Sequence, residues 1–108
     1  MKTLNHNERS FRIKALQEEL IEYANAKTIE DEIDALVDLV VFAMGTAERM
    51  GVIWELHWEE VMRTNMKKEL CKTTEKSKRG FKLDLCKPEN WTPPNHTKLI
   101  NIFYTEPA

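Results

Sequence analysis

The sequence predicts an all-α fold: an antiparallel helical bundle of two long helices plus a third, followed by an extended, proline-containing C-terminal arm. Helix-breaking residues are scarce in the first 80 positions, because the chain has three glycines and all four prolines lie in its last 21 residues. Apolar residues also recur at steps of three and four through about the first 70 positions, the period of an amphipathic helix. We expect one domain, residues 1–108, with its helical core over about 8–70 and its arm over about 71–108.

The first two helices are predicted from their caps and their apolar stripes. We expect one helix over about residues 8–26 with Asn7 as its N-cap. The second begins after Thr28, where Asp31 at the third helical position completes a pattern like a capping box, and it ends at Gly51. The apolar stripe of the first helix contains Ile13, Leu16, Leu20, Tyr23 and Ala24, and that of the second contains Ile33, Leu36, Val37, Val40, Val41, Met44 and Ala47.

The periodic pattern continues through a third helix and is then lost. We expect that helix over about residues 54–69, with an inward face formed by Trp58, Val61, Met62 and Met66. Residues 72–98 are rich in Lys, Pro and Thr and indicate a long ordered loop or arm. Residues 99–104 fit a short strand or a short helix equally well.

No part of the chain indicates a membrane span, a secretory signal or a zinc site. The longest apolar stretch, residues 35–44, is interrupted by Asp38, and the N-terminus lacks the apolar core of a signal peptide. We therefore expect a reducing, cytoplasmic location and no membrane partner. In that setting Cys71 and Cys86 are interpreted as free thiols in preference to a disulfide, and no Cys/His spacing suits zinc.

The near-neutral total charge hides a division between two halves of the chain. Residues 1–62 carry 13 acidic and 6 basic side chains, a net charge of −7, and residues 63–108 carry 5 acidic and 10 basic, a net of +5. Together these give the formal net charge of −2. The division indicates that one half holds cations and the other holds anions.

The acidic half concentrates its carboxylates on two neighbouring helices. Eight of the 21 positions from 18 to 38 are acidic, and their steps of three and four place them along helix faces. Because the turn near residue 28 is short, the two helices are expected to run antiparallel. That arrangement brings Glu22 level with Asp34 and Glu19 level with Asp38, so that four carboxylates converge.

Two interpretations of these carboxylates are possible. Most acidic runs are solvated helix faces, and this is the simpler interpretation. Like charges at close range repel, however, and a hard divalent cation such as Mg²⁺ relieves the repulsion through oxygen ligands. Asp38 also lies within an apolar run, where a surface carboxylate is not expected and a buried one needs a partner. This position favours a metal site.

The basic half admits three interpretations. Lys67 and Lys68 suit a helix C-terminus, and the further cations suit either a nucleic-acid surface or a phosphate clamp. These further cations are Lys72, Lys76, Lys78, Arg79, Lys82 and Lys87. Nucleic acid is not an expected partner, because the whole chain is acidic and contains no recognition motif. Trp91, beside Pro93 and Pro94, is expected to lie either on its own core or over a neighbour or a ligand base.

Four segments in order resemble those of MazG-like, all-α nucleoside triphosphate pyrophosphohydrolases of the small, single-domain type. The segment LQEELIE at residues 16–22, preceded by Phe11 and Arg12, looks like the family's EExxE motif, and DALVDLVVF at 34–42 resembles its second metal-binding helix. The third-helix segment EVMRTNMKK spans residues 60–68, and the C-terminal loop contains Lys87-Pro88 and WTPP at 91–94. One position departs: where the family's ExxD motif has Glu, this chain has Ala35, and Asp34 precedes it.

The resemblance implies Mg²⁺-dependent hydrolysis, with Mn²⁺ as an alternative ion, of a (deoxy)nucleoside triphosphate to the monophosphate and pyrophosphate. It implies metal ligation by Glu19, Glu22 and Asp38, with Asp34 as a further ligand. Glu18, Glu19 and Glu22 are the expected catalytic residues, with Glu18 orienting the site or activating water. Asn65, Lys68, Lys87 and Trp91 are the expected substrate-binding residues. Assembly as a homodimer or homotetramer is also implied. The alternative function is a non-catalytic helical module that binds a nucleotide or a protein, which Ala35 supports.

Overall fold

The computed structural model describes residues 1–71, 73, 75–81 and 83–104. Within these residues the predicted all-α class is confirmed, because four helices accompany only one small two-stranded sheet. The elements are α1 (His6–Asn25), α2 (Ile29–Met50), α3 (Trp54–Asn65), β1 (Glu69–Leu70), β2 (Leu85–Cys86) and α4 (His96–Phe103). They fall into two compact units, Met1–Trp54 and Glu55–Ala108, called unit 1 and unit 2 below. None of the described helices is long and apolar enough to cross a membrane.

Helix α1 begins earlier than the sequence predicted. Its N-cap is Asn5, whose side-chain oxygen accepts a hydrogen bond from the backbone N–H of Glu8 at 2.9 Å. The prediction of Asn7 as the N-cap is therefore wrong, and the helix begins at residue 6. Two asparagines stand near this helix start, and each suits a cap, so residue type alone does not choose between them.

Helix α2 has the caps that the sequence predicted. The Thr28 hydroxyl accepts a hydrogen bond from the Asp31 N–H at 3.1 Å, and the acidic residues of the first turn suit the positive end of the helix dipole. At the other end Gly51 has φ 76°, a left-handed conformation that ends the helix and that side chains disfavour.

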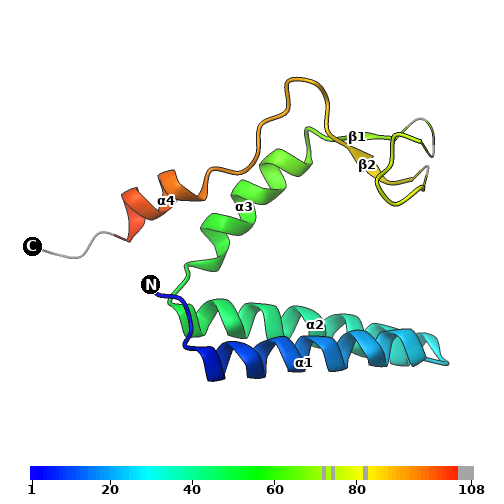
Figure 1. Cartoon of the computed structure of the whole chain (residues 1–108), viewed down its shortest axis with the longest axis vertical. Helices are drawn as coiled ribbons and strands as arrows, with labels where there is room; N and C mark the ends of the chain where they lie inside the picture. Colours follow the sequence, from blue (N-terminus) through cyan, green and yellow to red (C-terminus); the bar gives the residue numbers. More distant parts are fainter. Residues whose placement is uncertain (72, 74, 82, 105–108) are drawn as a thin grey trace, which may run out of the picture. The chain divides into compact units, whose positions relative to one another are not determined.

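Unit 1 is an antiparallel helical hairpin in which α1 and α2 lie side by side (Figure 1). The start of α1 is tied to the end of α2 by an ion pair between Glu8 and Arg49. Small side chains form the contact between the helices: Ala15, Ala35 and Ala47 are buried. Small residues allow a close approach of two helices, but they bury little apolar surface.

The larger apolar side chains of unit 1 stay exposed among the described residues. Leu36, Val37, Val40 and Val41 are 48–57% exposed. Exposed large hydrophobic residues in this unit also include Phe11, Ile13, Leu20, Ile21, Tyr23, Ile29, Ile33 and Met44. The stripes therefore have the predicted helical period, but the hairpin of α1 and α2 does not by itself cover these larger side chains.

Helix α3 ends at Asn65, four residues before its predicted end. The Thr64 carbonyl accepts a hydrogen bond from the Trp91 indole N–H at 2.7 Å and another from the Lys67 N–H at 3.2 Å. This tighter turn closes the helix. The predicted inward face is also wrong in part, because Trp58 and Met66 are 53% and 79% exposed and Met62 is exposed as well.

The predicted loop after α3 contains a strand pair closed by a disulfide. Strands β1 and β2 are antiparallel, with Glu69 opposite Cys86. Cys71 and Cys86 are joined by a disulfide bond, so the interpretation of both as free thiols is wrong. The Cys71 N–H also donates to the Asp84 carbonyl at 2.8 Å. Cys86 lies in β2 and Cys71 directly follows β1, so the strand pairing brings the two cysteines together, and their sequence spacing does not indicate this.

The undecided segment near the C-terminus is helix α4, which is fastened to α3 at its start. Asn95 caps the helix by accepting from the Lys98 N–H at 3.0 Å, and the Asn95 N–H donates to Glu60 of α3 at 2.6 Å. Glu60 also accepts two hydrogen bonds from Arg63. Arg63 and the Asn95 N–H lower the pKa of Glu60 to about 2, so the carboxylate remains ionised as a hydrogen-bond acceptor.

A second contact between α3 and α4 predicts a loss of stability in mild acid. His57 Nδ1 lies 2.8 Å from His96 Nδ1, and His57 Nε2 lies 2.8 Å from the Tyr104 hydroxyl. Burial, and then the His96 charge, lower the pKa of His57 below its ordinary 6.5. The unfolded chain therefore binds more protons than the folded chain just below pH 6.5, so stability falls as the pH falls through this range.

The measurement is the thermal unfolding midpoint of the wild type and of His57→Gln between pH 7.5 and 5.5. The wild-type midpoint is expected to fall more steeply, because only the wild type gains a proton on residue 57 as it unfolds. Parallel curves for the two proteins would contradict this account of the histidine pair.

Candidate functional site

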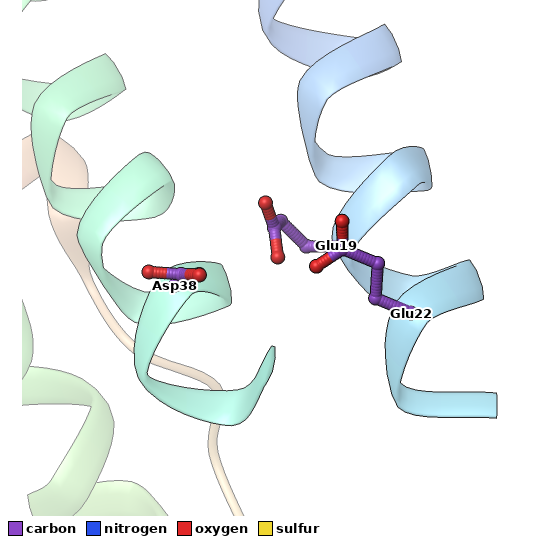
Figure 2. Close-up of side chains that lie close together, drawn as sticks. All are labelled: Glu19, Glu22 and Asp38. Carbon is purple, nitrogen blue, oxygen red and sulfur yellow. The ribbon is translucent and has the colours of Figure 1, made fainter. Parts of the chain in front are cut away.

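Three carboxylates of unit 1 converge between the two helices. Glu19 and Glu22 project from α1, Asp38 projects from α2, and one oxygen from each lies within 4.8 Å of the others. Figure 2 shows Glu19 extending toward Asp38, with the carboxylate of Glu22 beside it. The step of three residues on α1 and the antiparallel turn produce this arrangement. We call these three residues the carboxylate cluster.

The electrostatics of the carboxylate cluster are unfavourable without a cation. Glu19 is half-buried, and its Oε2 atom is buried without a hydrogen-bond partner. Partial burial raises the pKa of Glu19, and the neighbouring carboxylates Glu22, Asp38 and Glu18 raise it further. An oxygen that has neither solvent nor a donor is the kind of atom that a hard cation satisfies.

Two predicted site residues lie outside the carboxylate cluster. Asp34 lines a cavity of about 450 Å³ together with Glu22, Ala35 and Asp38, at the end of the hairpin near the turn. It therefore shares a cavity with two members of the cluster, Glu22 and Asp38, without being part of the cluster. Glu18 is exposed on α1 and is also not a member.

Asp38 does not lie in an apolar interior, contrary to the sequence prediction. Asp38 is exposed in the chain, and its neighbours Val37 and Val40 are 54% and 53% exposed as well. Asp38 reaches the carboxylate cluster because of its spacing along α2, which the sequence did predict. Burial was an unnecessary step in that inference.

Arg12 is a residue of this surface to which the sequence argument gave no role. Its side chain is half-buried, and its Nε atom is buried without a hydrogen-bond partner. One terminal nitrogen lies only 3.3 Å from where a Cβ on Gly45 would stand, so the glycine makes room for the guanidinium. Arg12 precedes Glu19 by seven residues, which places both on one face of α1 about 10 Å apart along the axis. The seven-residue step from Arg12 to Glu19 could therefore have predicted from the sequence that the two side chains share this surface.

The four predicted substrate-binding residues gather in unit 2. The Trp91 indole N–H donates to the Thr64 carbonyl, and the ammonium groups of Lys68 and Lys87 lie 5.2 Å and 4.8 Å from the Trp91 ring centroid. The Lys68 N–H donates to the carbonyl of Asn65 at 3.0 Å. Trp91 thus contacts its own unit, and its role in substrate binding stays a prediction.

A comparison with known protein families finds a match over the first three helices. A family model described as phosphoribosyl-ATP pyrophosphohydrolase matches residues 2–65, which are 64 of the 108 residues. The matched region contains α1, α2 and α3, and therefore the whole carboxylate cluster. No curated protein sequence matches the chain.

Proposed function

Because the chain belongs to the phosphoribosyl-ATP pyrophosphohydrolase family, within the MazG-like superfamily, we propose that it hydrolyses a (deoxy)nucleoside triphosphate to the monophosphate and pyrophosphate. The family is one of pyrophosphohydrolases that act on a nucleotide triphosphate. The observation that carries the proposal is the carboxylate cluster, which lies inside the matched residues. The small single-domain subtype and a cytoplasmic location are parts of the same proposal.

The carboxylate cluster fits the divalent cation that this chemistry uses. Three carboxylate oxygens lie within 4.8 Å of one another, and the Glu19 Oε2 atom has no partner among the described residues. Glu19, Glu22 and Asp38 would hold Mg²⁺ or Mn²⁺, with Asp34 across the adjoining cavity as a further ligand. When bound, the ion supplies positive charge that polarises phosphate oxygens.

The proposed reaction exchanges one bond at the α-phosphorus. The oxygen of a water molecule forms a bond to that phosphorus, and the anhydride bond to the β-phosphate breaks, so that pyrophosphate leaves. The water proton passes to a carboxylate, for which we propose Glu18 because it is exposed beside the cluster. Arg12 is a candidate to neutralise charge on the phosphate chain, since it shares a helix face with Glu19. Substrate binding by Asn65, Lys68, Lys87 and Trp91 stays a prediction.

The test is a screen of all nucleoside and deoxynucleoside triphosphates, with phosphoribosyl-ATP included because the family description names it. Pyrophosphate and inorganic phosphate are measured separately, with and without Mg²⁺ or Mn²⁺. We expect pyrophosphate from at least one substrate, and only with the ion. Inorganic phosphate as the primary product would contradict attack at the α-phosphorus, and no product from any substrate would contradict the proposed function.

One observation favours the alternative, a non-catalytic binding module. Ala35 is 2% exposed and lines the cavity beside Glu22 and Asp38, where the family motif has a glutamate. The site therefore has one carboxylate fewer than the family motif supplies. Under the alternative, wild-type protein binds nucleotide without turnover, and Ala35→Glu creates pyrophosphate release. Activity in the wild type would exclude the alternative.

The exposed apolar face of unit 1 predicts self-association. Unit 1 buries only small apolar side chains, and 12 large hydrophobic residues on its two helices stay exposed, which is unusual for a monomer. We propose that a second copy of the chain covers this face, as a homodimer or within a homotetramer. The occupant is inferred from the apolar character and the period of the stripes, which suit packing as a helical bundle.

Val40→Asp is expected to shift the protein toward the monomer, because it introduces a charge on this apolar face. The mass in solution is measured by light scattering during size-exclusion chromatography. Gln17→Asp is the matched control, because it adds the same charge at an exposed polar position of α1. A monomeric wild type would refute the proposal, as would equal effects of the two substitutions.

A further inference from the structure

Unit 2 contains a basic cavity beside its strand pair. Its volume is about 500 Å³, within the range of sites for small molecules. Its lining includes five basic side chains and one acidic one: Lys68, Lys76, Lys78, Arg79, Lys87 and Asp84. All of them follow residue 65, so the cavity lies outside the family match. Lys72 and Lys82 of the basic half lie outside the described residues.

The acidic residue of the basic cavity does not neutralise its lysines. The Asp84 carboxylate accepts hydrogen bonds from the Ser77 hydroxyl at 2.8 Å and from Arg79 at 2.7 and 2.8 Å. These partners lower the pKa of Asp84, and Ser77 is itself buried. Arg79 therefore balances the charge of Asp84. The lysines of the cavity form no ion pair with any described residue.

The lysines reach the basic cavity from three segments that the fold holds together. Lys68 follows α3 and Lys87 follows β2, and the Trp91 ring lies under both ammonium groups. That ring is fixed to the end of α3 by its hydrogen bond to the Thr64 carbonyl. Lys76 and Lys78 stand on the loop that the disulfide closes. The cavity is thus a defined part of unit 2.

Several ammonium groups around one concave space repel each other unless an anion lies between them. A short chain of phosphates fits this space, because it offers several charges and many acceptor oxygens within a small volume. A nucleic-acid strand fits less well, since such sites use a long groove with free aromatic faces. Here the ammonium groups of Lys68 and Lys87 already lie over the Trp91 ring. We propose that this cavity binds an oligophosphate chain, free or attached to a nucleoside, independently of the carboxylate cluster.

The test is calorimetric titration of the full chain with inorganic tripolyphosphate in the presence of EDTA, which removes divalent cations. We expect binding that weakens with added salt, and weaker binding of pyrophosphate and then of phosphate. Lys76→Gln and Lys78→Gln should each weaken tripolyphosphate binding about tenfold, the cost of one hydrogen bond to a charged group. Lys98→Gln removes the same charge from α4 and is the control. Equal weakening by all three variants would overturn the proposal, as would no binding.

Three further titrations distinguish a free phosphate chain, a nucleoside-linked chain, a nucleic-acid strand and binding in unit 1. Equal affinities for ATP and tripolyphosphate would mean that the cavity binds only the phosphate chain, whereas tighter binding of ATP would identify a nucleoside-linked ligand. If a 20-nucleotide oligothymidylate binds more tightly than tripolyphosphate, the proposal is overturned in favour of a nucleic-acid surface. Glu19→Gln should bind tripolyphosphate as the wild type does. Loss of binding in that variant would place the anion in unit 1. A wild-type protein that binds tripolyphosphate but releases pyrophosphate from no substrate would refute only the proposed function.

Discussion

Glu19→Gln is expected to lower the rate of pyrophosphate release by at least about 100-fold. Loss of a residue that only orients a metal ligand costs about 10–100-fold in affinity or activity, and Glu19 is proposed as a ligand itself. Its Oε2 atom is the buried oxygen without a partner in the carboxylate cluster. An amide in its place keeps the size of the side chain and removes its charge.

The same substitution should stabilise the protein when divalent ions are absent. The pKa of Glu19 is raised above its ordinary 4.5 by burial and by its acidic neighbours. A carboxyl group of this kind is better tolerated when protonated, so stability is lost as the pH rises through the folded-state pKa. At neutral pH a neutral amide removes this repulsion. If the Glu19 carboxylate instead stabilised the fold, Glu19→Gln would lower the stability of the protein in the absence of divalent ions.

Both effects are measured on the same protein samples. Pyrophosphate release is followed with Mg²⁺, and the thermal unfolding midpoint is followed in EDTA. Glu32→Gln is the matched control, because it removes an exposed carboxylate of α2 that is not a member of the cluster. A Glu19→Gln variant that is fully active would remove Glu19 from the site. A variant that is inactive and less stable in EDTA would indicate a folding defect.

The carboxylate cluster was predictable because it depends on local rules. Helical spacing places Glu19 and Glu22 on one face of α1, and the caps at Thr28 and Gly51 fix the length and start of α2. A three-residue turn then sets the alignment with Asp38. Each of these steps uses residues that are close in sequence. The convergence of Glu19, Glu22 and Asp38 was therefore predicted correctly, although Asp34 lies outside the cluster and Asp38 is exposed.

The burial of apolar residues was not predictable in the same way. A period of three and four tells which side chains share a helix face, but it does not tell what covers that face. Val40, Trp58 and Met66 have the expected period, yet they are 53%, 53% and 79% exposed. Burial depends on contacts with distant segments or with other chains, and a sequence pattern carries no record of those contacts.

The end of α3 and the strand pair of unit 2 were not predicted from the sequence, for a related reason. Helix α3 ends where Trp91, 27 residues later, donates to the Thr64 carbonyl. The strand pair forms because residues 69–70 meet residues 85–86. Neither contact has a local sequence signal, and the pairing of Cys71 with Cys86 follows from the second one.

Removing the disulfide is expected to expose the loop between the two strands. Cys71 and Cys86 are 15 positions apart, and closing a loop of that length stabilises the folded state by about 3 kcal/mol in the chain-entropy account. This free energy corresponds to a factor of about 100 or more in the population of the opened loop. The sheet that remains has only two residues in each strand, too little to hold the loop without help.

Limited proteolysis with trypsin measures this opening. Lys76, Lys78 and Arg79 are exposed cleavage sites on the loop, and cleavage follows the population of the open form when opening is rapid. The Cys71→Ser, Cys86→Ser double variant should be cut there about 100-fold faster than the oxidised wild type. Lys14, within α1, serves as an internal control whose cleavage should not change.

The reduced wild type separates the effect of the bond from the effect of the substitutions. If the disulfide stabilises the loop, reduction alone should raise loop cleavage to the level of the double variant, and tripolyphosphate binding should weaken in parallel, because Lys76 and Lys78 would no longer be held at the basic cavity. Equal cleavage of the oxidised and reduced proteins would show instead that the Asp84 hydrogen bonds with Ser77 and Arg79 are sufficient to hold the loop.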